Sequence, residues 1–71
     1  MSSRRYEFRI AGHLSERTRG AFTDLGDMAV EDAPPETVIS GEVVDDAQLH
    51  GVLALIRSLG LRVVSLHEMP R

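Results

Sequence analysis

The pattern of apolar and polar residues is best specified over residues 43–66, where it predicts a helix followed by a strand. Asp45 is typical of a helix N-cap, and Gln48, three positions later, completes a capping-box pattern. The helix is therefore expected to begin at Asp46. Gly60 is expected to end it, because glycine adopts the left-handed conformation that follows many helices. The predicted helix places five apolar residues on one face: Leu49, Val52, Leu53, Ile56 and Leu59.

A short β-rich run, Leu61–Leu66, follows directly and is predicted to be a strand that packs back against this helix. Its phase is ambiguous because Val63 and Val64 are adjacent and only one of them can face the helices. We take Val64 and Leu66 as the inward residues, which turns Val63 and Ser65 outward.

Strict alternation predicts another strand near the N-terminus, over Arg5–Ala11, with one apolar face formed by Tyr6, Phe8 and Ile10. Ser15 is expected to cap a short helix over Glu16–Leu25. Gly20 is expected to weaken this helix, because glycine has a low helix propensity. The helix is expected to contact the core through Ala21, Phe22 and Leu25.

The middle of the chain is predicted to be a pair of strands joined by a turn at residues 33–36, where two successive prolines exclude helix and strand interiors. The first strand, Asp27–Asp32, is flanked by acidic residues, as suits a sheet edge. The second, Thr37–Val44, has one face expected to be inward, formed by Ile39, Gly41 and Val43, and an outward face formed by Val38, Ser40 and Glu42.

The predicted order is therefore β-α-β-β-α-β, in one domain over residues 1–71 with residues 1–4 disordered. This order resembles the ferredoxin-like fold, an α+β class. The resemblance implies a four-stranded antiparallel sheet in the order 4-1-3-2, with two helices on one face and the other face open. It implies a scaffold and no particular activity, because many unrelated activities share this topology.

The segment GVLALIRSLGLRVVSL, residues 51–66, resembles the helix-strand signature of ACT-type regulatory domains. In those domains the signature follows the first strand and carries a ligand loop, whereas here it covers the second helix, so no ligand residues are carried over. The whole pattern is also similar to small uncharacterised proteins of GC-rich bacteria, and a bacterial source is the expectation from that similarity.

Composition narrows the function classes. A chain of seventy-one residues has a thin core, and without cysteine it forms no disulfide. No apolar run approaches the length of a membrane span. We therefore expect a soluble cytoplasmic protein with no membrane partner. Residues 1–19 hold five arginines and two acidic residues, whereas residues 20–51 hold eight acidic residues and no base. The sequence pI of 5.5 makes nucleic acid an unfavoured partner. A contact with nucleic acid remains an alternative, through Arg4, Arg5, Arg9, Arg17 and Arg19.

Catalytic candidates are few. His13, His50 and His67 are the best acid-base or metal-ligating side chains beyond the carboxylates, and the predicted topology does not bring all three together. We expect no cofactor, metal site or catalytic residue. An alternative is a small dimeric enzyme that uses His13 or His67 as a base.

The favoured hypothesis is a non-enzymatic binding or regulatory module that forms a homodimer and has a possible protein partner. The predicted interface is the open face of the sheet, which mixes modest apolar area with charges of both signs. We call its residues the open-face set: Arg5, Glu7, Arg9, Val38, Ser40, Glu42, Val63 and Ser65. Edge-to-edge pairing through the last strand is the main alternative surface, because that strand carries little charge.

Overall fold

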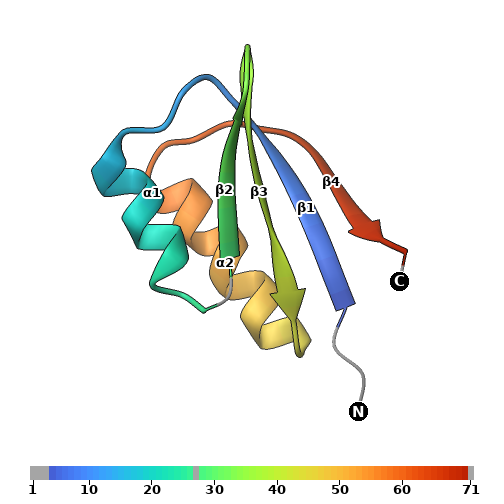
Figure 1. Ribbon diagram of the computed structural model, residues 1–71. Helices are drawn as coiled ribbons and strands as arrows, with labels where there is room; N and C mark the ends of the chain where they lie inside the picture. Colours follow the sequence, from blue (N-terminus) through green and yellow to red (C-terminus); the bar gives the residue numbers. More distant parts are fainter. Residues whose placement is uncertain (1–3, 27, 71) are drawn as a thin grey trace.

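The computed structural model describes residues 4–26 and 28–70 and contains six elements in the predicted order (Figure 1). The predicted disorder of residues 1–3 and the predicted strand start at Asp27 lie outside the described residues, and Arg4 already belongs to the first strand. The elements are β1 (Arg4–Ala11), α1 (Glu16–Thr23), β2 (Met28–Ala33), β3 (Glu36–Val43), α2 (Asp46–Ser58) and β4 (Val63–Met69).

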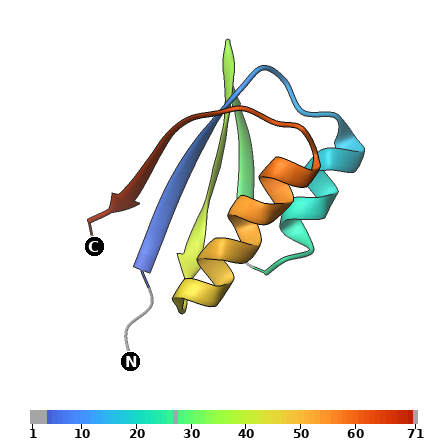
Figure 2. The same cartoon turned by 180° about the vertical axis from the view of Figure 1, so that it is seen from behind.

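The four strands form one antiparallel sheet in the order β2-β3-β1-β4, which is the predicted order. The central strands are β1 and β3, and the edges are β2 and β4. Both helices lie on the same side of the sheet, and β4 stands apart from them at the far edge (Figure 2). The predicted ferredoxin-like, α+β arrangement is therefore confirmed.

The core lies between the helices and the two central strands plus β2. Phe8 and Ile10 of β1 are completely buried, as is Ile39 of β3, and the inward phases predicted for both strands are confirmed. The helices add Phe22, Val52 and Ile56 to this cluster. Full burial of one such side chain stabilises the fold by about 1.5–3 kcal/mol, so these few residues carry much of the hydrophobic stabilisation.

The start of α2 agrees with the capping pattern predicted from the sequence. The Asp45 carboxylate accepts a hydrogen bond from the Gln48 backbone N–H at 2.8 Å, which confirms the predicted N-cap. The Gln48 side chain reaches back as a capping box requires, but it accepts from the Val44 N–H at 2.8 Å, one residue before the cap. At the other end Gly60 has a φ of 72°, as predicted for a residue that ends a helix.

Two predicted core contacts at helix ends are wrong. Leu25 is exposed because α1 ends at Thr23, two residues earlier than predicted, and Leu25 lies in the following turn, where its N–H donates to the Phe22 carbonyl at 3.1 Å. Leu59 is also exposed, because it is the C-cap of α2 and the apolar face of that helix is already complete at Ile56.

The last strand begins later and extends further than predicted. β4 covers Val63–Met69 instead of 61–66, since β1 is long enough to pair with it as far as Met69. The register shifts between Arg9 and Ile10 of β1, so that Arg9 pairs with Ser65 and Ile10 with Val63. Val64 is thus an extra residue in β4, a β-bulge that alternation alone does not reveal.

Candidate functional site

The sheet register brings most of the open-face set together. Directly opposite residues of an antiparallel pair project from the same face of a sheet. Arg5 lies opposite Glu42, and Glu7 lies opposite Ser40. Arg9 lies opposite Val38 on one side and Ser65 on the other. These seven residues therefore occupy one continuous surface on the side away from the helices.

Val63 does not belong to that surface. It pairs with Ile10, a completely buried residue that faces the helices, so the register places Val63 on the helix side. The sequence interpretation placed it outward because it assumed strict alternation through Val64. The bulge at Val64 inserts one residue, which reverses the phase on its N-terminal side.

Charges on the open face are partly neutralised within the chain. The guanidinium of Arg9 lies 3.4 Å from the Glu7 carboxylate and 3.3 Å from the Glu36 carboxylate. The register also places residues outside the predicted set on this face, among them His67 opposite Glu7, Met69 opposite Arg5 and Glu31 opposite Val38. The open face thus carries charges that alternate in sign along β1, together with the apolar residues Val38 and Met69.

The helix side of β4 is different in character. We define the β4 strip as the three exposed apolar residues of this strand: Val63 (38% exposed), Val64 (50%) and Leu66 (37%). The register places Val63 and Leu66 on the helix side, and Val64 is the bulged residue between them. Leu66 lies opposite the buried Phe8 and so faces the helix side of the sheet. Neither helix extends over this strand (Figure 2). The strip therefore lies on an edge strand, whose only described partner in the sheet is β1.

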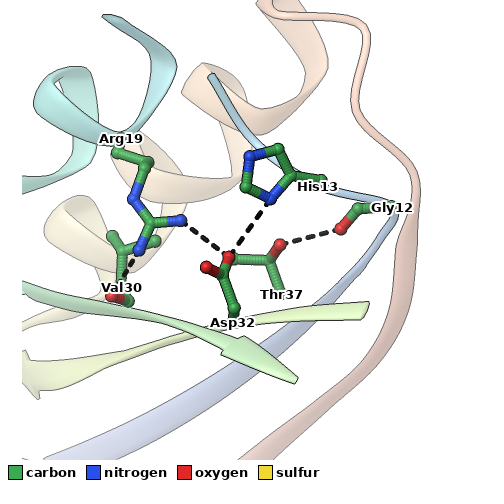
Figure 3. A network of polar contacts seen from close by, with 6 residues as sticks. All are labelled: Gly12, His13, Arg19, Val30, Asp32 and Thr37. Carbon is green, nitrogen blue, oxygen red and sulfur yellow. Dashed lines mark hydrogen bonds and ion pairs between the residues drawn. The ribbon is translucent and has the colours of Figure 1, made fainter. Parts of the chain in front are cut away.

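A polar cluster ties α1 to β2 at the opposite edge (Figure 3). The guanidinium of Arg19 donates to the Asp32 carboxylate at 2.8 Å and to the Val30 carbonyl at 3.2 Å. His13 Nδ1 lies 3.3 Å from the same carboxylate. The hydrogen bond from Arg19 lowers the pKa of Asp32 below its ordinary value, and His13 acts in the same direction. We call Arg19, Asp32 and His13 the α1–β2 clamp.

A buried hydroxyl lies beside this clamp. Thr37 is completely buried and donates through Oγ1 to the Gly12 carbonyl at 2.7 Å, which fixes the segment after β1 to the start of β3 (Figure 3). Sequence reasoning missed this contact, although Thr37 shares the inward phase of Ile39. That phase was the available signal, because a threonine pointing into a core needs a hydrogen-bond partner.

The clamp also borders a small cavity of about 170 Å³, lined in part by His13, Asp32 and Glu36. A carboxylate that orients an imidazole is one part of a general-base arrangement. The nearby hydroxyl of Ser15 is already engaged, because it donates to Thr18 Oγ1 at 3.0 Å and accepts from the Thr18 N–H. Among the described residues the contacts around His13 are those of a structural clamp. His67, the other predicted base, lies on the open face opposite Glu7.

A larger cavity of about 350 Å³ lies where β1 begins and α2 begins. Its polar lining residues are Arg4, Tyr6, Asp45 and Asp46. A hydrogen bond with Tyr6 and the nearby Glu68 carboxylate raise the pKa of Arg4. The Arg4 guanidinium lies 3.7 Å from that carboxylate, in an exposed ion pair.

The five N-terminal arginines do not form one basic surface. Arg5 and Arg9 project from the open face, whereas Arg17 and Arg19 belong to α1 on the other side of the sheet. Arg9 and Arg19 already meet carboxylates of this chain. A phosphate backbone would have to compete with those carboxylates.

Within residues 4–26 and 28–70, no group of three or more histidine and acidic side chains is arranged to hold a metal ion. Neither α1 nor α2 combines the length and hydrophobicity that a membrane-crossing helix needs.

Comparison with known proteins places the chain in a family. The profile of a domain of unknown function, DUF8691, matches residues 5–67, which is most of the chain and covers all or part of each of the six elements. The chain therefore belongs to the DUF8691 family. A search among curated proteins gave no match.

Proposed function

We propose that this domain is a non-enzymatic binding module whose working form is a homodimer. The observation that carries the proposal is the β4 strip. Three large apolar side chains lie exposed on one short strand of a 71-residue chain whose hydrophobic core is small. A domain of this size has a thin stability margin, and burial of such side chains against a second copy stabilises both copies.

The open face supports the binding role in a different way. Its alternating charges, with Arg5 opposite Glu42 and Arg9 beside Glu7, suit reversible recognition of a polar partner surface more than permanent burial. The resemblance of residues 51–66 to ACT-type regulatory domains supports a regulatory use of that recognition. This segment corresponds to most of α2 and the first half of β4.

Sedimentation of the full chain over a range of concentrations tests the proposal. We expect a monomer–dimer equilibrium, with dimer the main species at about 100 μM, because association of a small interface depends on concentration. A chain that remains monomeric at that concentration contradicts the proposal. Sedimentation of the same samples at raised salt then reports how far charged contacts contribute to the dimer.

A further inference from the structure

The geometry points to the outer edge of β4 as the surface that binds the second copy, through antiparallel β4–β4 pairing that joins two sheets into one of eight strands. This inference rests on the proposed self-association and specifies its surface. It favours the alternative surface named from the sequence, edge-to-edge pairing through the last strand, over the leading prediction, which assigned the dimer contact to the open face.

The free backbone of β4 is the first reason. A strand at a sheet edge presents unpaired N–H and C=O groups, and the same strand from an identical chain supplies matching groups when it runs antiparallel. The seven residues of β4 extend for roughly 23 Å at about 3.3 Å per residue. An edge of that length is long enough to pair with another strand.

The chemistry of the two sheet edges is the second reason. The β2 edge carries Glu31 and Asp32 and leads into Pro34, features that discourage strand pairing. The β4 edge has apolar residues over its first half, and its acidic residue, Glu68, lies near its end. Pairing through β4 therefore avoids the like-charge repulsion that two β2 edges would meet.

Symmetry provides the third reason. Two identical strands that pair antiparallel are related by a two-fold axis perpendicular to the sheet, so the helices of both copies lie on the same side. The regular part of β4 after the bulge is Ser65–Met69. Pairing centred on Leu66 sets this residue against Leu66 of the second copy on the helix side, and sets Ser65 opposite the second copy's His67 on the open side.

This arrangement also buries the β4 strip. A standard protein–protein interface buries about 800 Å² on each partner, which is roughly a sixth of the 4699 Å² surface of this chain. Backbone pairing alone buries only a narrow band of surface, so the β4 strip has to contribute to the buried area. The open face then remains accessible on both copies and forms a continuous polar surface for another partner.

A matched pair of variants tests the inference. Val64→Glu adds a negative charge to the β4 strip at a residue that is 50% exposed, and pairing centred on Leu66 sets this residue opposite the second copy's Glu68, so the two like charges repel. Val44→Glu makes the same change at a valine that is 60% exposed and lies outside β4. Sedimentation at about 100 μM should show at least a tenfold rise in the dimer dissociation constant for Val64→Glu. Val44→Glu should match the parent chain. Circular dichroism of each variant verifies that the fold is retained.

Val38→Glu on the open face separates this inference from the proposed function. If Val38→Glu dissociates the dimer and Val64→Glu does not, the dimer stands but the β4 assignment is overturned. If the parent chain itself is monomeric, both fail.

Amide hydrogen exchange of the parent chain gives a second measurement that needs no variant. Protection that rises with protein concentration within residues 63–69 supports the edge pairing, and protection that rises only in β3 overturns it.

Discussion

The two edges of the sheet are built in opposite ways. At the β2 edge, α1 packs over the strand, Met28 is 5% exposed, and Arg19 binds both the Asp32 carboxylate and a β2 carbonyl. At the β4 edge neither α1 nor α2 packs over the strand, and Val64 and Leu66 are exposed. The β2 edge is thus covered by a helix and carries charged residues, whereas the β4 edge is uncovered and carries exposed apolar residues.

The difference shows how helix placement decides which surface remains for partners. α1 has eight residues and contacts β2, and α2 has thirteen and contacts β3, so the helix layer is centred away from β4. Exposed apolar side chains at a strand edge promote pairing with another chain. The fold thus covers the β2 edge within the monomer and leaves the β4 edge available to another chain.

The largest expected effect compares a buried side chain near the β2 edge with an exposed apolar side chain at the β4 edge. Phe22→Ala removes a completely buried ring that holds α1 on the sheet and should lower the free energy of unfolding by about 3–5 kcal/mol. Leu66→Ala at the β4 edge should cost about 1 kcal/mol, because the side chain is already 37% exposed.

Urea titration at low protein concentration measures both values, since dimerisation adds a concentration-dependent contribution to stability. Equal costs would show that the two edges are packed alike in the monomer.

Much of the architecture behind the two sheet edges could be predicted from the sequence. The inward phases of β1 and β3, the Asp45 cap and the strand order all follow from alternation, capping chemistry and connection rules, and these were confirmed. Local rules failed where tertiary geometry decided the outcome. The end of α1 before Leu25 and the bulge at Val64 depend on how neighbouring elements meet, which residue periodicity does not encode.

A smaller effect concerns α2, the helix that lies between the two edges. Asp45→Ala removes the oxygen that accepts from the Gln48 N–H and should cost about 1 kcal/mol of stability. Asp45→Asn keeps an acceptor at the same position and should recover most of that loss. Thermal unfolding of the three chains measures the difference. An unchanged midpoint in Asp45→Ala would mean that the cap contributes little and that α2 is held by packing alone.

The candidate site was only partly predictable. Seven residues of the open-face set share a surface, because strand phase and order together define a sheet face. The α1–β2 clamp was not foreseen, since it joins residues 13, 19 and 32, which sit in three different segments with no sequence pattern linking them. Long-range polar contacts of this kind require the packed structure.

The clamp itself provides the next test. Arg19→Met keeps the length and apolar stem of the side chain but removes its donors to Asp32 and to the Val30 carbonyl. Because the Asp32 carboxylate is solvent-exposed, screening limits the loss, and we expect about 0.5–1 kcal/mol. Arg17→Met, on the same helix, is the matched control. A cost for Arg17→Met as large as that for Arg19→Met would show that the donors of Arg19 do not anchor the β2 edge.

The smallest expected effect is a pH dependence confined to the β2 edge. Arg19 lowers the pKa of Asp32 in the folded chain. A lowered folded-state pKa stabilises the fold above the unfolded-state value, about 3.9 for aspartate, and that stabilisation is lost as the pH falls through the folded-state pKa. Stability should therefore decrease below about pH 4, and Asp32→Asn should make that decrease shallower. Glu31→Gln changes the net charge equally without altering the clamp. Unfolding midpoints between about pH 2 and 6 measure the slopes, and identical slopes for the parent and Asp32→Asn would show that the clamp does not couple this edge to pH.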